Sequence, residues 1–178
     1  MTLPIKLVRF NGEKRELINL LCTNAWNFHS SPKVDASSIE KKVDIGFYEN
    51  EREAYWIIHN SEKIGFLIIE DIEDSIPLFD LRLTTAIRGK GIGLHVLLWL
   101  QDYLFGEKAK IRIEAYTRAD NLAMRKCLMK AGFVKEGYLR NAWENDDGTI
   151  HDSVLYAVIF EDWKNKTISD IKLFDLPF

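Results

Sequence analysis

The pattern of apolar and polar positions in the first half of the chain predicts several strands and two helices. Runs rich in β-branched and aromatic residues are bounded by turn-forming residues such as Asn60 and Ser61, which is typical of strands. In the last of these runs, Leu81 and Leu83 alternate with polar residues, as expected when one face of a strand packs on a core. The predicted strands cover residues 5–10, 54–58, 64–70 and 77–85, and the predicted helices cover residues 13–24 and 39–43.

In the second half, Leu97, Leu100 and Leu104 recur at helical spacing. The predicted elements are a helix at residues 94–105, a strand at 111–117, a helix at 121–131, and a hairpin with strands at 133–143 and 150–160. Because a helix connects the strands at 77–85 and 111–117, we expect these two strands to be parallel and adjacent. The pattern therefore predicts an α/β fold with a mixed sheet.

Composition narrows the class of protein. The 178 residues suit one domain, expected over residues 1–178 with a core at 5–163 and a C-terminal tail at 164–178. The net charge of -3 argues against a nucleic-acid partner, which needs a basic surface. No apolar run approaches the ~20 residues that span a bilayer, and the N-terminus lacks a signal-peptide pattern. We therefore expect a cytoplasmic protein, monomeric or homodimeric, that binds neither a membrane nor nucleic acid.

The cysteines and histidines predict no metal site. Cys22 and Cys127 do not form a CxxC pair, and His29, His59 and His95 lack the spacing of metal ligands. We expect these histidines to have core or surface roles.

A glycine-rich turn at residues 88–93, Arg-Gly-Lys-Gly-Ile-Gly, carries the strongest functional signal. It follows a predicted strand and opens a predicted helix. Glycines allow a ligand to approach the backbone closely, and a helix N-terminus offers unpaired N–H donors and partial positive charge. Arg88 and Lys90 add positive charge for a phosphate or pyrophosphate. The turn therefore predicts an anion site.

Two other phosphate-binding motifs do not fit this turn. A P-loop needs Ser or Thr after its Gly-Lys pair, whereas Lys90 is followed by Gly91. A dinucleotide fingerprint that began at Gly89 would need a third glycine where Leu94 stands.

The remaining match is to the GCN5-related N-acetyltransferases (GNAT), whose pyrophosphate motif is Arg/Gln-x-x-Gly-x-Gly/Ala. Arg88, Gly91 and Gly93 fill this pattern. Residues 121–133 resemble the second family signature, an asparagine followed by a helix that ends in Gly-Phe. The final hairpin is similar to that of the branch containing the ribosomal-protein N-terminal acetyltransferases, which also holds enzymes acting on small amines.

The resemblance implies a single-domain acyl-CoA N-acyltransferase fold, with a mostly antiparallel sheet, a splayed parallel pair of strands and flanking helices. It implies direct transfer of an acetyl group from acetyl-CoA to a primary amine, on a peptide N-terminus or a small molecule, without a metal. The co-substrate would lie between the splayed strands. The residues that it implies for cofactor binding are Leu83, Arg88, Gly89, Lys90, Gly91, Ile92, Gly93 and Asn121.

The chain departs from the family pattern at two positions that concern catalysis. Many relatives carry a tyrosine acid where this chain has Leu128, and some carry a glutamate where it has Tyr116. We therefore expect Glu114, on the same strand face as Tyr116, to accept the proton of the amine, with Tyr116 orienting it or acting as an acid. Asp80 is the next candidate, although it can pair with Arg82.

Two competing functions remain open. The missing tyrosine is consistent with a CoA-binding regulatory module that does not turn over. An enzyme that modifies antibiotics or polyamines would differ only in its acceptor.

Overall fold

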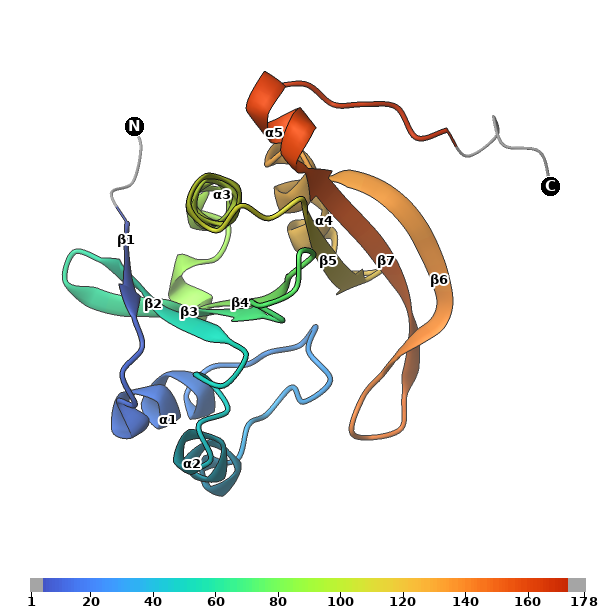
Figure 1. Cartoon of the computed structure of the whole chain (residues 1–178). Coiled ribbons are helices and arrows are strands. Elements are labelled where there is room, and N and C mark those ends of the chain that lie inside the picture. The colour runs from blue at the N-terminus through green and yellow to red at the C-terminus, as the bar shows by residue number, and fades with distance from the viewer. Residues whose placement is uncertain (1–4, 173–178) are drawn as a thin grey trace.

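The computed structural model describes residues 5–172 and contains seven strands around which the helices are arranged (Figure 1). The strands are β1 (Lys6–Arg9), β2 (Glu53–His59), β3 (Glu62–Glu70), β4 (Leu78–Leu83), β5 (Arg112–Arg118), β6 (Val134–Glu144) and β7 (Ile150–Ile159). The α-helices are α1 (Lys14–Cys22), α2 (Ala36–Asp44), α3 (Ile92–Gln101), α4 (Leu122–Lys130) and α5 (Phe160–Asn165). A 3-10 helix covers Thr85–Ile87, and a π-helical segment covers Asp102–Glu107.

The strands form two antiparallel sheets, β1-β2-β3-β4 and β5-β7-β6. The sheets meet where β4 and β5 run side by side at their starts. There the Ile111 and Glu114 amides donate to Ser75 O at 3.1 Å and Pro77 O at 3.2 Å. Beyond Pro77 the two strands diverge, and the described structure shows no further pairing between them (Figure 1). The fold therefore has a split between two sheets.

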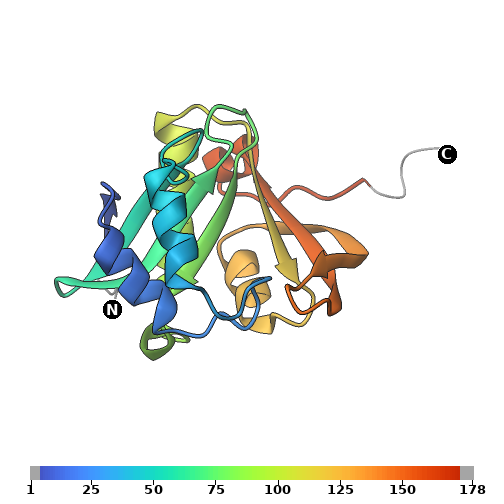
Figure 2. The same cartoon turned by 90° about the horizontal axis from the view of Figure 1, so that it is seen from below.

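Two hydrophobic cores hold the helices against the first sheet. Helices α1 and α2 cover one face, where Trp56 and Phe66 are buried with Leu17 and Ile39. Helix α3 covers the opposite face of the sheet. The second core lies there and also includes residues of α4 and of the second sheet. Figure 2 shows α1 and α2 side by side in front of the first sheet. Side chains alternate along β4, so every second side chain points to the face covered by α1 and α2, and the others point toward α3.

The fold class and the splayed strand pair are confirmed, and several boundaries are corrected. The sheet is divided into two at the split, because β4 and β5 separate after only two bonds. The helix predicted at 94–105 begins at Ile92 and changes to π-helical geometry after Gln101. Helix α5 was not predicted, since its six residues are too short to show a helical period. Gly132 has a φ of +89°, as expected after a helix C-terminus.

The expected domain span stays a prediction, since its ends at 1–4 and 173–178 lie outside the described residues. Across positions 5–172, no helix has the length and apolar content that a bilayer crossing requires.

Candidate active site

The edge of β4 that faces β5 carries backbone groups that β5 does not reach. Pro77 O points toward β5, whereas the Thr84 amide donates to Ile64 O on β3 at 2.9 Å. Backbone groups of successive strand residues point to alternate sides, so Leu81 and Leu83 direct their N–H and C=O groups into the split. An extended ligand with amide groups could pair with this edge, as a third strand would.

The glycine turn has the geometry expected of an anion site. Gly89 and Gly91 have φ values of +77° and +83°, and a Cβ on either would meet no described atom within 4 Å. Gly91 is the N-cap of α3, so the free N–H groups of the first helical turn begin there. Gly93 has a different role, because a Cβ there would lie 3.2 Å from the Sγ of Cys127 on α4. Two glycines therefore leave space beside the backbone, and the third allows α3 and α4 to pack closely.

The Arg88 side chain is bound to the protein's own backbone. Its Nε donates to Leu83 O at 2.9 Å, and its Nη2 donates to Ala25 O at 2.7 Å. The guanidinium lies 5.2 Å from the ring centre of Trp26, and burial lowers the pKa of Arg88. Arg88 thus fastens the glycine turn to the segment between α1 and α2. Its contribution to anion binding remains a prediction.

Asn121 is the N-cap of α4. Its Oδ1 accepts from the Met124 amide, and its Nδ2 donates to Thr117 Oγ1, each at 3.2 Å. Asn121 also lines the cavity described next. Leu128, at the position of the family's tyrosine, is fully buried on the same helix. An acid from this position is therefore absent.

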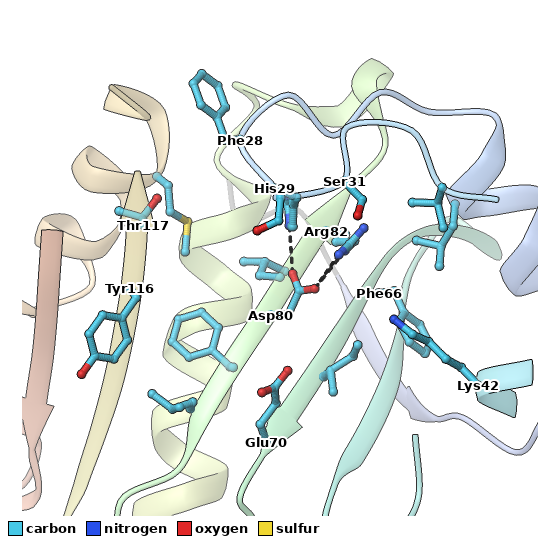
Figure 3. Close-up of a pocket in the computed structure, with 18 of the residues that line it drawn as sticks. Phe28, His29, Ser31, Lys42, Phe66, Glu70, Asp80, Arg82, Tyr116 and Thr117 are labelled. Atoms are coloured by element: carbon cyan, nitrogen blue, oxygen red, sulfur yellow. Dashed lines mark hydrogen bonds and ion pairs between the residues drawn. The ribbon is translucent and has the colours of Figure 1, made fainter. Parts of the chain in front are cut away.

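A cavity of about 690 Å³ connects the split to the face of β4 covered by α1 and α2. On the split side it is lined by residues of β4, β5 and α4, including Leu81, Thr117 and Asn121. On the helical side it is lined by β3, α2 and the segment between α1 and α2. Figure 3 shows polar side chains of both sheets around this space. One cavity therefore joins a slot for an extended ligand, between β4 and β5, to a polar chamber, which is the part lined by β3, α2 and the segment between α1 and α2.

Asp80 lies on the chamber side and binds two partners. Its Oδ1 is 3.0 Å from His29 Nε2, and its Oδ2 accepts from Arg82 Nε at 2.9 Å (Figure 3). The hydrogen bond from His29 and the charge of Arg82 outweigh burial and lower the pKa of Asp80 to about 2. Asp80 is therefore ionised at neutral pH.

Glu114 and Tyr116 both line the cavity, from β5. The Glu114 carboxylate accepts from Arg112 Nε at 2.7 Å and from the Tyr116 hydroxyl at 3.2 Å. Burial and the Glu114 charge raise the pKa of Tyr116. The Tyr116 ring points away from the Asp80 carboxylate (Figure 3). The structure thus places Glu114 and Tyr116 together and Asp80 apart from them, while their catalytic roles remain predictions.

The tip of the β6–β7 hairpin closes one side of the chamber. The Asp146 amide donates to Ser30 O at 3.0 Å, and the Ser31 hydroxyl donates to the Asp146 carboxylate. Trp143, near the same tip, lines the cavity, and its indole N–H is buried without a hydrogen-bond partner among residues 5–172. The hairpin and the segment between α1 and α2 therefore form a joint wall.

The GNAT acetyltransferase domain model matches residues 7–134, which cover most of the chain and include the glycine turn. The chain belongs to the GNAT acetyltransferase family. It is therefore an acetyl-CoA-dependent acetyltransferase that acts on an amine. No comparison singles out the ribosomal-protein branch, which stays a prediction.

Solved structures of other GNAT enzymes share the fold of this acetyltransferase. The spermidine N-acetyltransferase of Vibrio cholerae, in complex with CoA and spermine, is 18% identical, with a TM-score of 0.78 over 90% of this chain and 98% of its own. A dodecameric structure of that enzyme in an intermediate state is 17% identical, with a TM-score of 0.75 over 91% and 97%. No curated protein matches the sequence significantly. At these identities the likeness concerns the fold alone.

Two cavity residues of this GNAT enzyme were missed in the sequence. His29 was expected to have a core or surface role, and Glu70 was not considered. His29 lies in a loop without periodicity, 51 residues before its partner Asp80. The signal available was the pair of polar residues Asp80 and Arg82 on the face of β4 that the helices cover.

Proposed function

We propose that this GNAT enzyme transfers an acetyl group directly from acetyl-CoA to a primary amine of a small, positively charged acceptor. The pyrophosphate would bind the backbone of residues 88–93, and the pantetheine arm would lie between β4 and β5. There it would pair with the backbone groups of Leu81 and with the Leu83 N–H, and Asn121 would contact it from the other side. Backbone amides of β4 would stabilise the charge that develops on the thioester oxygen.

The observation that carries the proposal is the cavity that joins the split to the chamber. Because the chamber and the slot are parts of one cavity, an amine in the chamber could reach a thioester at the end of the pantetheine slot. The charged residues of the lining favour a cationic acceptor, because five carboxylates stand against three lysine and arginine side chains. The carboxylates are Asp35, Glu70, Asp80, Glu114 and Asp146, and the cations are Lys33, Lys42 and Arg82.

Glu70 is the carboxylate best suited to bind an ammonium group. It lies at the end of β3 and points into the cavity (Figure 3). Within residues 5–172 it forms no hydrogen bond or ion pair with another side chain, and burial raises its pKa. A positively charged ligand group beside Glu70 would offset the free-energy cost of keeping this partly buried carboxylate ionised. A second ammonium on the acceptor fits this role.

The wall formed by Ser30, Ser31 and Asp146 favours a small acceptor over a peptide chain, because it closes the chamber on the hairpin side. The name of the Vibrio cholerae enzyme, which acts on spermidine, is consistent with a polyamine acceptor. A peptide N-terminus is the second candidate, since the hairpin resembles that of the peptide-acetylating branch. An aminoglycoside and a CoA-binding module without turnover are further outcomes. We also propose a cytoplasmic location and a monomer or homodimer, without a metal.

A screen of acceptors with acetyl-CoA tests the proposal, with CoA thiol release and the mass of the product as readouts. The panel contains polyamines, monoamines, peptides with free N-termini and aminoglycosides. We expect polyamines to have the highest kcat/KM. Glu70→Gln should raise the KM for a polyamine about tenfold and leave the KM for acetyl-CoA unchanged, since one charged contact is lost.

Glu62→Gln is the matched control, because Glu62 begins the same strand and lies outside the cavity. Preference for peptides, with equal kinetics of the Glu70→Gln enzyme, would replace the small cationic acceptor with a peptide N-terminus. Binding of CoA without acetylation of any amine would overturn the enzymatic proposal.

A further inference from the structure

We infer that His29 is the group that takes the proton from the acceptor amine, with Asp80 as its positioning residue. The inference rests on the proposed function, because it names the base of that reaction. The pair differs from the expected base, Glu114, in its strand, its partners and its place in the cavity.

The pair lies where the slot and the chamber meet. The backbone groups of Leu81 face the split. The side chain of the preceding residue, Asp80, points to the face of β4 that α1 and α2 cover, like that of its partner Ile68 on β3. His29 reaches this carboxylate from the segment between α1 and α2 and lines the same cavity. An amine that approaches a thioester bound along β4 therefore passes beside the imidazole.

The hydrogen bond fixes which nitrogen is basic. The Asp80 carboxylate is ionised, with a pKa of about 2, and can only accept. His29 Nε2 must therefore donate the proton in the 3.0 Å contact. In the neutral imidazole the lone pair then lies on Nδ1, the arrangement in which a carboxylate orients a histidine base. Nδ1 has no hydrogen-bond partner among the described residues, and it is buried, so neighbouring side chains must shift before an amine can reach its lone pair.

The surroundings hold the pair in place before a ligand binds. Arg82 binds the second oxygen of Asp80 through Nε and Nη2, each at 2.9 Å. The Trp26 ring packs edge-on against His29, with ring centres 6.0 Å apart. On either side of His29, Asn27 O accepts from Arg118 Nη1 at 3.2 Å and Ser30 O accepts from the Asp146 amide. A loop anchored at both sides therefore holds the imidazole beside Asp80 before a ligand binds.

Other titratable groups of the cavity are less suited to this role. Glu114 is bound by Arg112 and by the Tyr116 hydroxyl. The charged and titratable groups that line the cavity with His29 come from both sheets, from the α1–α2 side and from the hairpin. They are Asp80 and Arg82 on β4, Glu70 on β3, Glu114 and Tyr116 on β5, Lys33, Asp35, Lys42 and Tyr48 on the α1–α2 side, and Asp146 on the hairpin. Among these groups in the described structure, only Asp80 forms a hydrogen bond with the imidazole.

The acceptor ammonium transfers one proton to His29 Nδ1, and the imidazolium that forms is stabilised by the Asp80 carboxylate. The neutral amine attacks the thioester carbon, which forms the C–N bond and places negative charge on the oxygen. When the intermediate collapses, the C–S bond breaks and the thiolate takes the second proton from the attacking nitrogen. His29 then releases its proton to solvent. The net products are the N-acetylated amine, the CoA thiol and one proton.

The test is a pH–rate profile of the wild type, His29→Gln and His29→Ala with one acceptor that the wild type acetylates. General-base catalysis contributes ~10²–10⁴-fold, so His29→Gln should lose kcat in that range and keep its affinity for acetyl-CoA. The acidic limb that belongs to the imidazole should disappear. Added imidazole should restore part of the rate of His29→Ala, a rescue that a purely structural role would not give.

His95→Gln is the control, because His95 lies on α3 outside the cavity. If His29→Gln keeps the wild-type rate and acidic limb, His29 is not the base, and the proposed function stands with Glu114 as the next candidate. If the wild type acetylates no amine, the proposed function fails, and this inference fails with it.

Discussion

The two sides of the split between β4 and β5 are built on different principles. On the proposed co-substrate side, the groups that would bind are backbone N–H groups at a helix N-terminus, and their geometry comes from glycines with positive φ. On the proposed acceptor side, the groups that would bind are side chains from distant segments, as in the pair His29 and Asp80. A backbone site serves a co-substrate common to the family, whereas a side-chain site can change its acceptor without altering the fold.

Arg88 connects the two sides. It belongs to the glycine motif, yet its guanidinium binds Ala25 O in the segment that carries His29. The position of the acceptor wall is therefore fixed in part by a residue of the co-substrate motif. Substitutions on each side should show how independent the two sites are.

The largest effect is expected for Gly91→Trp on the co-substrate side. The indole would fill the space beside the turn, and φ is +83° there. Loss of two charge-assisted hydrogen bonds would weaken CoA binding ~100-fold or more, as measured by calorimetric titration. Gly12→Trp is the control, since Gly12 has a φ of +78° and open space but lies before α1. Unchanged CoA affinity in a folded Gly91→Trp protein would remove the glycine turn from the site.

The next effect compares two carboxylates whose hydrogen bonds and neighbouring cations lower their pKa to about 2, Asp80 and Glu53. Both should stabilise the fold above pH ~4, their unfolded range, and this stability should be lost as the pH falls through about 2. Asp80→Asn and Glu53→Gln should therefore each cost on the order of 2 kcal/mol near pH 7 in denaturant titrations, and only a small part of that near pH 2, where each carboxylate is half protonated in the folded protein.

Only Asp80→Asn should also affect the reaction, because Glu53 lies outside the cavity, bound to Arg9 and Lys108. We expect kcat to fall ~10-fold, since the imidazolium that forms during the reaction loses its counter-charge. Equal kcat values for both variants would make Asp80 a structural carboxylate like Glu53.

A smaller effect is expected for Arg88→Ala, which should raise the acceptor KM several-fold as well as weaken CoA. Loss of its bond to Ala25 O frees the segment before His29, at a cost of about 1 kcal/mol for one hydrogen bond. Lys90→Ala should weaken CoA binding alone, because Lys90 is exposed and, in the described structure, forms no hydrogen bond or ion pair with that segment. Initial rates measured with each substrate varied in turn would give the KM for the acceptor and the KM for acetyl-CoA. If the acceptor KM is unchanged in Arg88→Ala, the two sides are independent.

The same comparison explains what could be predicted from the sequence. The positions of the strands up to β4, the glycine turn and the helix that follows Asn121 could be predicted from local patterns, and the structure has them close to the expected residues. The division into two sheets was not visible, because it depends on where β4 and β5 stop pairing. His29 escaped notice for a similar reason, since a histidine in an irregular loop becomes significant only when the fold brings Asp80 to it. Glu70 is distinguished by having no side-chain partner in the described part of the chain, which a sequence does not show.

The central claim is that the acetyl group passes directly from a thioester in the split to an amine in the chamber. Initial rates of the wild-type enzyme, with acetyl-CoA and the preferred amine both varied, test this most directly. The account predicts intersecting double-reciprocal lines, and an intact-protein mass that acetyl-CoA alone does not change. Parallel lines, together with an acetylated protein formed before the amine is added, would contradict it.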